Sequence, residues 1–243
     1  MNGTVLTTEM LLPILYIPLL LLGLSVAYTA IVIILERNKY YDSIYYSATK
    51  IKFLKVIFDT GRCGEYRTSQ HLKSIEGYKK LLLNVYLPTH DQQTTEVDII
   101  AITQKGIIVI ENKNYHGTIY GSEQDVYWTQ ALGGKKHKFY NPIRQNDGHV
   151  KALKLQLPGI SEFAYTSLTV FNDNCTLKKI QVSDSCIVVQ AKQLRQTIQE
   201  MFSKKPVIFS KQSVVFIYDS FNVFTNAEDS IKQSHIRRVN AFK

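Results

Sequence analysis

The chain of 243 residues carries 29 Lys and Arg against 20 Asp and Glu, which gives a formal net charge of +9. This length suits one domain with a full hydrophobic core plus a further segment. The three cysteines, Cys63, Cys175 and Cys186, are an odd number without Cys-x-x-Cys spacing. They support neither a disulfide framework nor a zinc site, and they fit a reducing compartment.

The N-terminal part contains an uncharged apolar run from Met10 to Leu35. About 20 apolar residues suffice to cross a bilayer as a helix, so residues 1–35 are predicted to hold one membrane-spanning helix, with contact to lipid through residues 10–35. A cleaved signal peptide is the weaker alternative, because no basic residue precedes the run and cleavage after Ala30 would leave an apolar end exposed. Every Lys and Arg follows Leu35, which predicts a single-pass protein of the cell membrane with a cytoplasmic C-terminal domain.

Residues 36–60 are basic and rich in tyrosine, and we expect either a continuation of this helix or a juxtamembrane linker. Tyrosine rings favour the membrane interface, so this is where we expect the four tyrosines Tyr40, Tyr41, Tyr45 and Tyr46 to lie. The positive charge of the chain suits a phosphate polymer such as nucleic acid. The cluster from Lys50 to Lys55 would equally suit an anionic membrane leaflet, and charge alone does not decide between these partners.

The next part of the chain alternates between helix and strand patterns. A helix is predicted from Gly61 to about Ile75, ended by Gly77. A basic loop is expected after Gly133-Gly134, and a helix from Pro142 to Leu157. Five strands are predicted between these helices: Lys80–Leu87, Val97–Thr103, Ile107–Lys113, Gly117–Gly121 and Val126–Gln130.

The remaining residues, 158–243, are expected to complete or extend the same domain, whose core spans residues 61–157. The economical fold is α/β, with a helix, antiparallel strands, a helix and further strands in that order. The patterns in this last part predict strands at Thr166–Phe171 and Cys186–Val189, a helix near Lys192–Phe202, an apolar segment at Ser213–Tyr218 and a polar helix near Ala227–Arg238.

Acidic and basic side chains interrupt the apolar pair of strands around residues 96–113. Asp98 precedes the connection, and Glu111 and Lys113 share one face of the following strand. If the connection Gln104–Gly106 has three residues, Asp98 lies opposite Asn112 and the two carboxylates point to different faces. We therefore predict a one-residue bulge or a strong local twist here. Taken singly, each of these charges is more simply explained as part of a solvated face or of a cross-strand ion pair.

Several short motifs occur in a fixed order along the chain. They are Gly64-Glu65 in a helix, Glu96-Val-Asp98, Gly106-Ile-Ile-Val-Ile-Glu111-Asn-Lys113, Gly117, Trp128 and Asn141-Pro-Ile-Arg-Gln145. This combination resembles the nuclease-related domain (NERD) family of the PD-(D/E)xK nuclease superfamily, over about Gly61 to Leu157. The resemblance implies a core like that of restriction endonucleases.

The resemblance also implies a metal site. Asp98 and Glu111 would hold Mg²⁺, or Mn²⁺ in its place. The backbone carbonyl of Asn112 would be a further ligand, since hard oxygen donors suit such ions.

Three further residues would carry the chemistry implied by the resemblance. Lys113 would orient or deprotonate the attacking water and stabilise charge on the phosphate, Glu65 would add to the metal site or its surroundings, and Gln145 would complete the pocket. The other candidates are weaker: no nucleophile elbow accompanies His149, which is more simply a satisfied or solvent-facing side chain, and His116 in a loop is more simply incidental.

The expected function is therefore a membrane-anchored, Mg²⁺-dependent nuclease that hydrolyses phosphodiester bonds of DNA. The run Lys135-Lys136-His137-Lys138 with Tyr140 would either follow the phosphate backbone or form a solvated loop. Two alternatives stay open. One is a catalytically silent module of the same fold that binds nucleic acid or a protein partner, and the other is an anchor that organises an assembly without nucleic acid.

Overall fold

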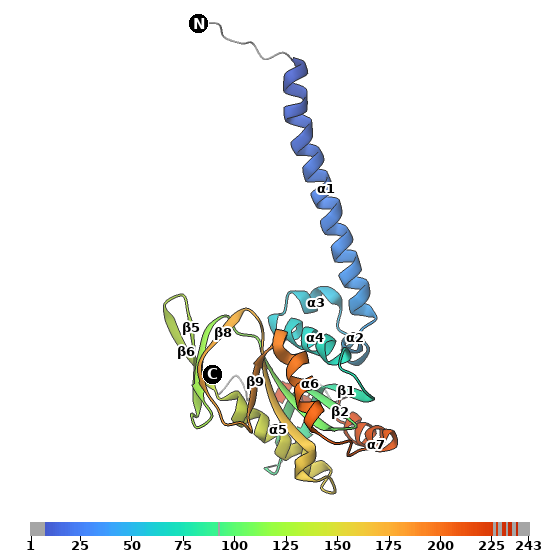
Figure 1. The fold of residues 1–243 in the computed structure, drawn as a ribbon, viewed down its shortest axis with the longest axis vertical. Helices are drawn as coiled ribbons and strands as arrows, with labels where there is room; N and C mark the ends of the chain where they lie inside the picture. The colour runs from blue at the N-terminus through green and yellow to red at the C-terminus, as the bar shows by residue number, and fades with distance from the viewer. Residues whose placement is uncertain are drawn as a thin grey trace.

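The fold consists of a long N-terminal helix that projects from an α/β domain (Figure 1). This computed structural model describes residues 8–91 and 93–225, together with residues 227, 230, 231, 233, 234 and 237. Half of the residues of the polar helix predicted near Ala227–Arg238 therefore lie outside the described residues.

Helix α1 (Thr8–Tyr41) runs unbroken for 34 residues, so it continues past Leu35, as one of the two expectations for residues 36–60 had it. Its stretch Tyr16–Tyr41 is the one helix in the described part of the chain that is long and apolar enough to cross a membrane. The apolar side chains of this helix from Tyr16 to Leu35 are exposed rather than packed against the domain. Exposure of such an apolar surface is favourable in lipid, whereas in water it raises the free energy of the protein.

The segment after α1 folds back onto the domain. It forms two short helices, α2 (Ile44–Thr49) and α3 (Phe53–Ile57). Tyr40 and Tyr45 are completely buried in the domain core, and the Tyr40 hydroxyl donates to the carbonyl of Ile51 at 2.7 Å. The expectation that these two rings contact the lipid interface is therefore wrong, because they are buried inside the domain where it meets the end of α1.

A five-stranded mixed sheet forms the centre of the domain. The strand order is β1-β2-β3-β7-β9, with β1, β2 and β3 antiparallel and β7 and β9 parallel to β3. The last two strands lie beyond residue 157 and complete the sheet that the first three begin. The bounds are β1 (Lys79–Pro88), β2 (Thr94–Thr103), β3 (Gly106–Lys113), β7 (Tyr165–Phe171) and β9 (Ile187–Gln190).

Helices cover both faces of this sheet. One face packs against α4 (Thr60–Lys73) and α6 (Leu194–Lys204), and the other against α5 (Pro142–Gln156) and α7 (Lys211–Asn222). This arrangement explains why β3 is apolar at consecutive positions, since a strand covered on both faces has no solvated side. The predicted α/β order of helix, antiparallel strands, helix and further strands is confirmed.

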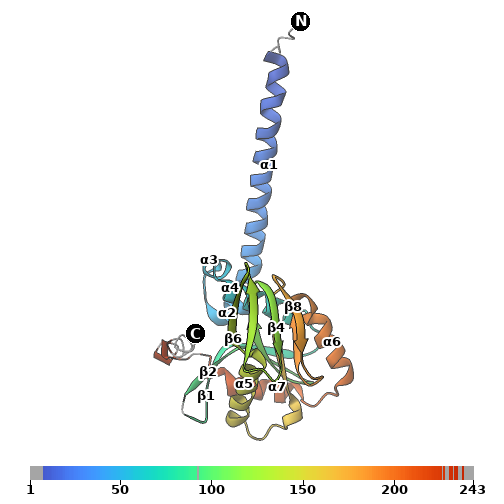
Figure 2. The same cartoon turned by 90° about the vertical axis from the view of Figure 1, so that its left-hand side faces the viewer.

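A second sheet of four strands lies beside the central one (Figure 2). Its core contact is Trp128, which stacks on Phe171 of β7 with ring centroids 5.9 Å apart. Gly121 is required at this contact because a Cβ atom there would lie 2.3 Å from the Trp128 ring. The strand order is β6-β5-β4-β8, with bounds β4 (Gly117–Ser122), β5 (Tyr127–Leu132), β6 (Lys135–Tyr140) and β8 (Cys175–Gln181).

Two strands of this second sheet were not predicted. The expected basic loop at Lys135–Lys138 is instead strand β6, which pairs with β5 across a tight turn at Gly133 and Gly134, both with positive φ. β6 is an exposed edge strand. Its side chains therefore do not alternate between buried and exposed positions. Lysines are common on such a strand because they discourage edge-to-edge pairing. β8 is largely exposed for the same reason.

The connection between β2 and β3 differs from the prediction. Thr103 pairs with Gly106, so the turn has two residues rather than three, and the register stays constant to the pair Ile99–Ile110. Continuing this register sets Asp98 opposite Glu111, not opposite Asn112. No bulge between these strands is needed to bring the two carboxylates to one side.

A distortion does occur next to Asp98, but between β1 and β2. Asn84 of β1 has a positive φ of 53°, and the side chains before and after it do not follow one regular alternation between the two faces of the sheet. Leu83 pairs with Ile99 in one core and Val85 pairs with Val97 in the other. Residues two apart in a regular strand share a face, so the strands twist sharply at the level of Asp98.

Candidate active site

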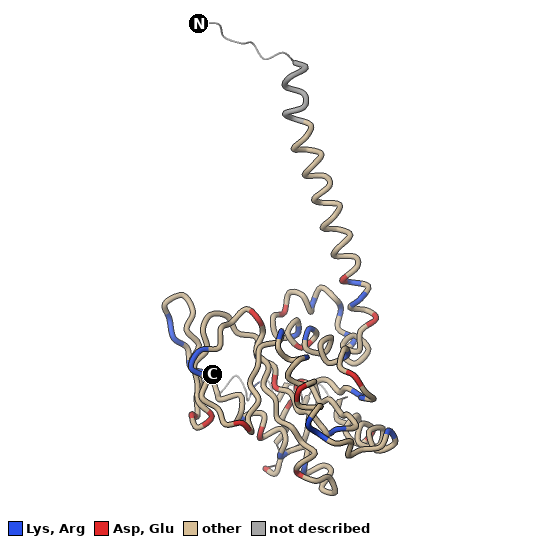
Figure 3. The backbone as a smooth tube through the Cα atoms, in the orientation of Figure 1, with Lys and Arg blue, Asp and Glu red and all other residues tan. Residues whose placement is uncertain are grey.

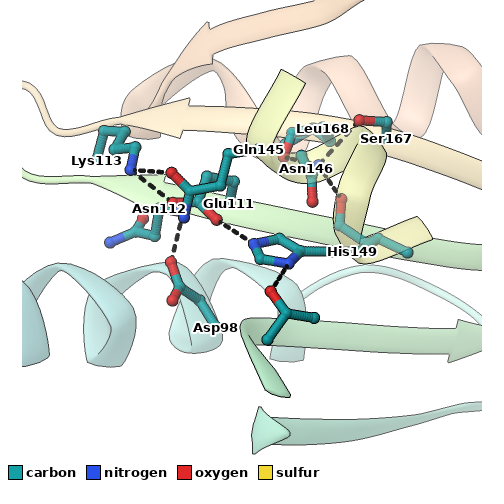
Figure 4. A network of polar contacts seen from close by, with 11 residues as sticks. Asp98, Glu111, Asn112, Lys113, Gln145, Asn146, His149, Ser167 and Leu168 are labelled. Atoms are coloured by element: carbon teal, nitrogen blue, oxygen red, sulfur yellow. Dashed lines mark hydrogen bonds and ion pairs between the residues drawn. The ribbon is translucent and has the colours of Figure 1, made fainter. Parts of the chain in front are cut away.

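The carboxyl end of β3 carries a lysine held between two partners. Lys113 Nζ lies 2.7 Å from Glu111 Oε1 and donates to Gln145 Oε1 at 2.8 Å (Figure 4). Glu111 and Lys113 reach the same side because they are two apart in the strand. Gln145 comes from the first turns of α5, on the face of the sheet that this helix covers.

A histidine completes the contacts of Glu111. His149 Nε2 lies 2.9 Å from Glu111 Oε2, and its Nδ1 lies 2.9 Å from Thr95 Oγ1. A neutral imidazole protonated at Nε2 would donate to the carboxylate and accept from the hydroxyl. The alternative that His149 faces solvent is wrong, since the residue is buried; it is satisfied, and its partner is a predicted site residue. Its spacing four residues after Gln145 was the available signal, because such residues share a helix face.

The Glu111–Lys113 pair is charged in this arrangement. Burial acts to raise the pKa of Glu111, but Lys113 and His149 outweigh it and the pKa lies below its ordinary value. Burial likewise acts to lower the pKa of Lys113, but the ion pair with Glu111 outweighs it and the pKa lies above its ordinary value. Lys113 is therefore an ammonium at neutral pH, suited to stabilising negative charge rather than to accepting a proton.

Asp98 has the opposite balance. Its Oδ2 accepts a hydrogen bond of 2.8 Å from the backbone nitrogen of Asn112. Burial and the neighbouring carboxylates of Glu111 and Glu65 raise the pKa of Asp98 well above its ordinary value. The hydrogen bond from Asn112 and the charge of Lys113 act in the opposite direction but do not outweigh these effects, so the protein offsets the charge of this carboxyl group only in part.

Glu65 projects from the first half of α4. Its Oε2 accepts a hydrogen bond of 2.9 Å from the hydroxyl of Tyr45. Burial raises the pKa of Glu65 to about 7, although the Tyr45 hydrogen bond acts in the opposite direction. Glu96 adds to the increase, which places this second glutamate close to Glu65 as well. Tyr45 was not predicted to take part, because it lies 20 residues away in the segment that follows α1.

The approach of α4 to β3 depends on a glycine. A Cβ atom at Gly64 would lie 2.6 Å from the side-chain nitrogen of Asn112. One turn further along α4, Thr68 Oγ1 donates to Asn112 Oδ1 at 2.7 Å. Gly64 and Thr68 are four apart and face the strand together, which explains why glycine precedes Glu65 in the sequence.

Two asparagines hold the start of α5 against the sheets. Asn141 caps the helix by accepting from the backbone nitrogen of Ile143 at 2.9 Å, and its Nδ2 donates to carbonyls of the turn at residues 122–125. Asn146 Nδ2 donates to the carbonyl of Val109 at 2.9 Å. These contacts fix the helix on which Gln145 and His149 lie.

A cavity of about 210 Å³ adjoins the site at Asn112. It lies between α4 and the carboxyl ends of β3, β7 and β9, where ligands of sheets with parallel strands commonly bind. The predicted loop residue His116 contributes to its wall. The polar residues that line it include Arg67, His71, Asn112, Asn114, Asn172 and Asp173.

The described residues contain no group of three or more His, Cys, Asp or Glu side chains arranged to hold a metal ion. The expected convergence of three carboxylates is therefore not present as a closed cluster. The donors that could hold a divalent cation are the carboxylates of Asp98 and Glu111 and the carbonyl of Asn112 between them. Their chemistry fits such an ion, because they are hard oxygens and the protein offsets the charge of Asp98 only in part, as its raised pKa indicates.

Comparisons with known proteins give the family of the chain. The chain is 32% identical over 183 residues to an uncharacterized protein of Bacillus anthracis, an alignment that covers 73% of this chain and 82% of the relative. The crystal structure of a protein of unknown function, AF1548, aligns with 58% of this chain at 14% identity and a TM-score of 0.31, and the chain spans 55% of its length. Residues 60–172 match the nuclease-related domain, so the match includes β7 as well as the predicted motifs, and the chain belongs to the nuclease-related domain (NERD) family.

Proposed function

We propose that this protein is a membrane-anchored, Mg²⁺-dependent nuclease that hydrolyses phosphodiester bonds of DNA. The observation that carries the proposal is the partly buried ammonium of Lys113, held between Glu111 and Gln145 beside the carboxyl group of Asp98, whose pKa is raised. A positive charge and a group of hard oxygen donors side by side are what phosphodiester hydrolysis requires.

Three residues would hold the cation. They are Asp98, Glu111 and, through its backbone carbonyl, Asn112, with Mn²⁺ as a substitute for Mg²⁺. The bound ion would polarise a phosphoryl oxygen and lower the pKa of water. The hydrogen bond from the Asn112 nitrogen orients Asp98, and the contact with His149 orients Glu111.

Lys113 would stabilise the negative charge that develops on the phosphate. Gln145 accepts from its Nζ and so fixes the direction of the ammonium group. Because the pKa of Lys113 is raised by its ion pair, we assign it the role of an electrostatic stabiliser and hydrogen-bond donor to water, not that of the base. Glu65 would act at the edge of the site, where the Tyr45 hydroxyl positions it.

The second sheet would guide the nucleic acid. Lys135, Lys136 and Lys138 are exposed on β6, and this strand leads directly into α5 and Gln145. The ring of Phe139 lies 4.4 Å from that of Tyr115, two residues after Lys113, so the strand runs beside the site. Exposed lysines along an edge strand are suited to phosphate contacts.

The helix α1 would tether the enzyme to the cell membrane. The charged residues nearest to the apolar stretch on the domain side include Arg37 and Lys39. Such residues favour the cytoplasmic side, so the domain would act on nucleic acid in the cytoplasm.

The test is cleavage of DNA by the full chain in nanodiscs. Supercoiled plasmid, linear duplex and single-stranded DNA are incubated with Mg²⁺ or Mn²⁺ over a concentration series. Cleavage that depends on the metal, is lost in Asp98→Asn and is retained in Asp219→Asn is expected, since Asp219 makes the same chemical change on the exposed side of α7. Equal cleavage by both variants would contradict the proposed site.

A second candidate function is a catalytically silent member of the family that binds nucleic acid. One observation favours it: both oxygens of Glu111 already bind protein groups, Lys113 and His149. In that case the protein would bind DNA with an affinity that falls steeply with salt, and it would cleave none of the three substrates in either metal.

A further inference from the structure

The outward face of α3 is apolar. Leu54, Ile57 and Phe58 are 62%, 42% and 82% exposed, whereas Phe53 and Val56 on the opposite face are buried in the core. Residues 54, 57 and 58 follow the i, i+3, i+4 spacing of one helix face. The exposed side of this short helix is thus an apolar surface that the fold of the domain does not cover.

Exposed lysines surround this apolar face. Lys50, Lys52 and Lys55 all lie at the surface, and none of them takes part in the ion pairs found among the described residues. We refer to Leu54, Ile57 and Phe58 with these three lysines as the α3 surface. Apolar side chains framed by basic ones are suited to the boundary of an anionic bilayer.

The position of the α3 surface is fixed relative to the end of α1. The ring of Phe53, the first residue of α3, packs at 5.5 Å from the ring of Tyr40, which lies in the last turn of α1. Both views of the fold place α3 at the end of the domain from which α1 projects (Figures 1 and 2). Lysines and arginines gather at this same end (Figure 3).

The length of α1 sets the level of the membrane surface. About 20 residues at 1.5 Å per residue cover the roughly 30 Å of hydrocarbon, which for a stretch that starts at Tyr16 ends close to Glu36. Tyr40 is one turn further along, so only about 6 Å of helix separates the hydrocarbon boundary from the ring against which α3 packs. That distance is within the headgroup layer.

We propose that the α3 surface inserts into the interface of the same bilayer that α1 spans, with anionic lipid headgroups as its partners. This inference rests on the membrane anchoring proposed above. Leu54, Ile57 and Phe58 enter the boundary between headgroups and acyl chains, and the three lysines contact lipid phosphates. The domain is thereby held in one orientation on the membrane, instead of turning freely on a tether.

The experiment uses the full chain in nanodiscs with two kinds of brominated lipid, one with bromine near the headgroup end of the acyl chains for the α3 surface and one with bromine near the chain ends for α1, because bromine quenches nearby tryptophan. The chain has one native tryptophan, Trp128, which is buried and forms a constant background. Phe58→Trp reports on the α3 surface and Tyr28→Trp on α1. Phe163→Trp is the matched control, since Phe163 is 92% exposed and lies in η1 (Glu162–Ala164), beyond the end of α5 that faces away from α1 in Figure 1.

The expected result is a loss of emission for Phe58→Trp comparable to that for Tyr28→Trp, with none for Phe163→Trp. The loss should be larger with phosphatidylserine present than with phosphatidylcholine alone. Adding Lys52→Glu and Lys55→Glu to Phe58→Trp should reduce it, whereas adding Lys151→Glu, an exposed change on α5, should not.

Three results would overturn the proposal. If Tyr28→Trp is quenched and Phe58→Trp is not, α1 spans the bilayer but the α3 surface does not contact it. A blue-shifted but unquenched Phe58→Trp means that a protein, such as a second copy of the chain, covers the surface. If neither reporter is quenched, α1 does not span the bilayer, and the membrane part of the proposed function is also wrong.

Discussion

The end of β3 lies between α5 on one face of the sheet and α4 on the other, and the acidic side chains on these two sides differ in how their charge is balanced. On the α5 side, the carboxylate of Glu111 is bonded to Lys113 and His149, and its pKa is lowered despite burial. On the α4 side, the pKa of Glu65 is raised, and no ion pair among the described residues includes it or Asp98. The carboxyl groups between α4 and β3 therefore tend to hold protons, and a cation bound there would favour their charged forms.

The largest expected effect comes from removing the positive charge on the α5 side. Lys113→Ala should lower the rate of plasmid cleavage by about 100-fold or more, as for the loss of one preorganised electrostatic stabiliser. Lys151→Ala, the same substitution at a lysine of α5, should leave the rate unchanged. Cleavage by Lys113→Ala at the native rate would show that the contrast between the two sides has no role in catalysis.

The second prediction concerns the other partner of Glu111. His149→Ala leaves a buried carboxylate oxygen and the hydroxyl of Thr95 without their partner, so the free energy of unfolding should fall by about 1–3 kcal/mol. Denaturant unfolding of the full chain in detergent, followed by Trp128 fluorescence, measures this change. His116→Ala, at an exposed loop position, should alter it by no more than about 0.5 kcal/mol. Equal changes in both variants would mean that the contact with Glu111 contributes nothing.

The third prediction uses the raised pKa on the α4 side. Glu65 has a pKa of about 7 in the folded protein against an ordinary value of 4.5. Between these values the folded state holds a proton that the unfolded state has released, so stability falls as pH rises, by up to about 1.4 kcal/mol per pH unit. Glu65→Gln should reduce this dependence and leave the part that comes from Asp98, whose pKa is also raised. The measurement is the unfolding free energy from pH 4.5 to 7.5 in the presence of a chelator.

A control sharpens the same measurement. Adding Mg²⁺ should reduce the dependence on pH in the native chain, because a cation near the carboxylates favours their charged form. Glu162→Gln, which changes an exposed glutamate on the far side of the domain, should keep the native slope. A slope in Glu65→Gln that equals the native slope would show that Glu65 does not take up the proton.

The smallest expected effect concerns the hydroxyl that links the end of α1 to the site. Tyr45→Phe removes the hydrogen bond that lowers the pKa of Glu65, so this pKa should rise above about 7. Carboxyl chemical shifts of glutamate followed over a pH titration report the change. Tyr46→Phe, in the same short helix, should have no effect, and a pKa that falls in Tyr45→Phe would contradict the assigned contact.

Much of the site could be predicted from residue spacing along single elements. Glu111 and Lys113 share a side because strand residues two apart always do, and the structure brings Lys113 and Gln145 together as expected. His149 was missed, although its helical spacing from Gln145 pointed to it. The pairing of Asp98 was also misplaced, because one residue in the length of a turn changes the register of the whole pair.

The apolar length of α1, the α/β order of elements and membership of the NERD family follow from the sequence by itself, since each depends on local composition, periodicity or short motifs. The tertiary structure alone decided three other features: the burial of Tyr40 and Tyr45, the contact of Tyr45 with Glu65, and the opposite charge balance on the two sides of β3. These features depend on which groups from distant segments pack together. Burial and neighbouring charges, unlike residue type, are properties of the assembled fold.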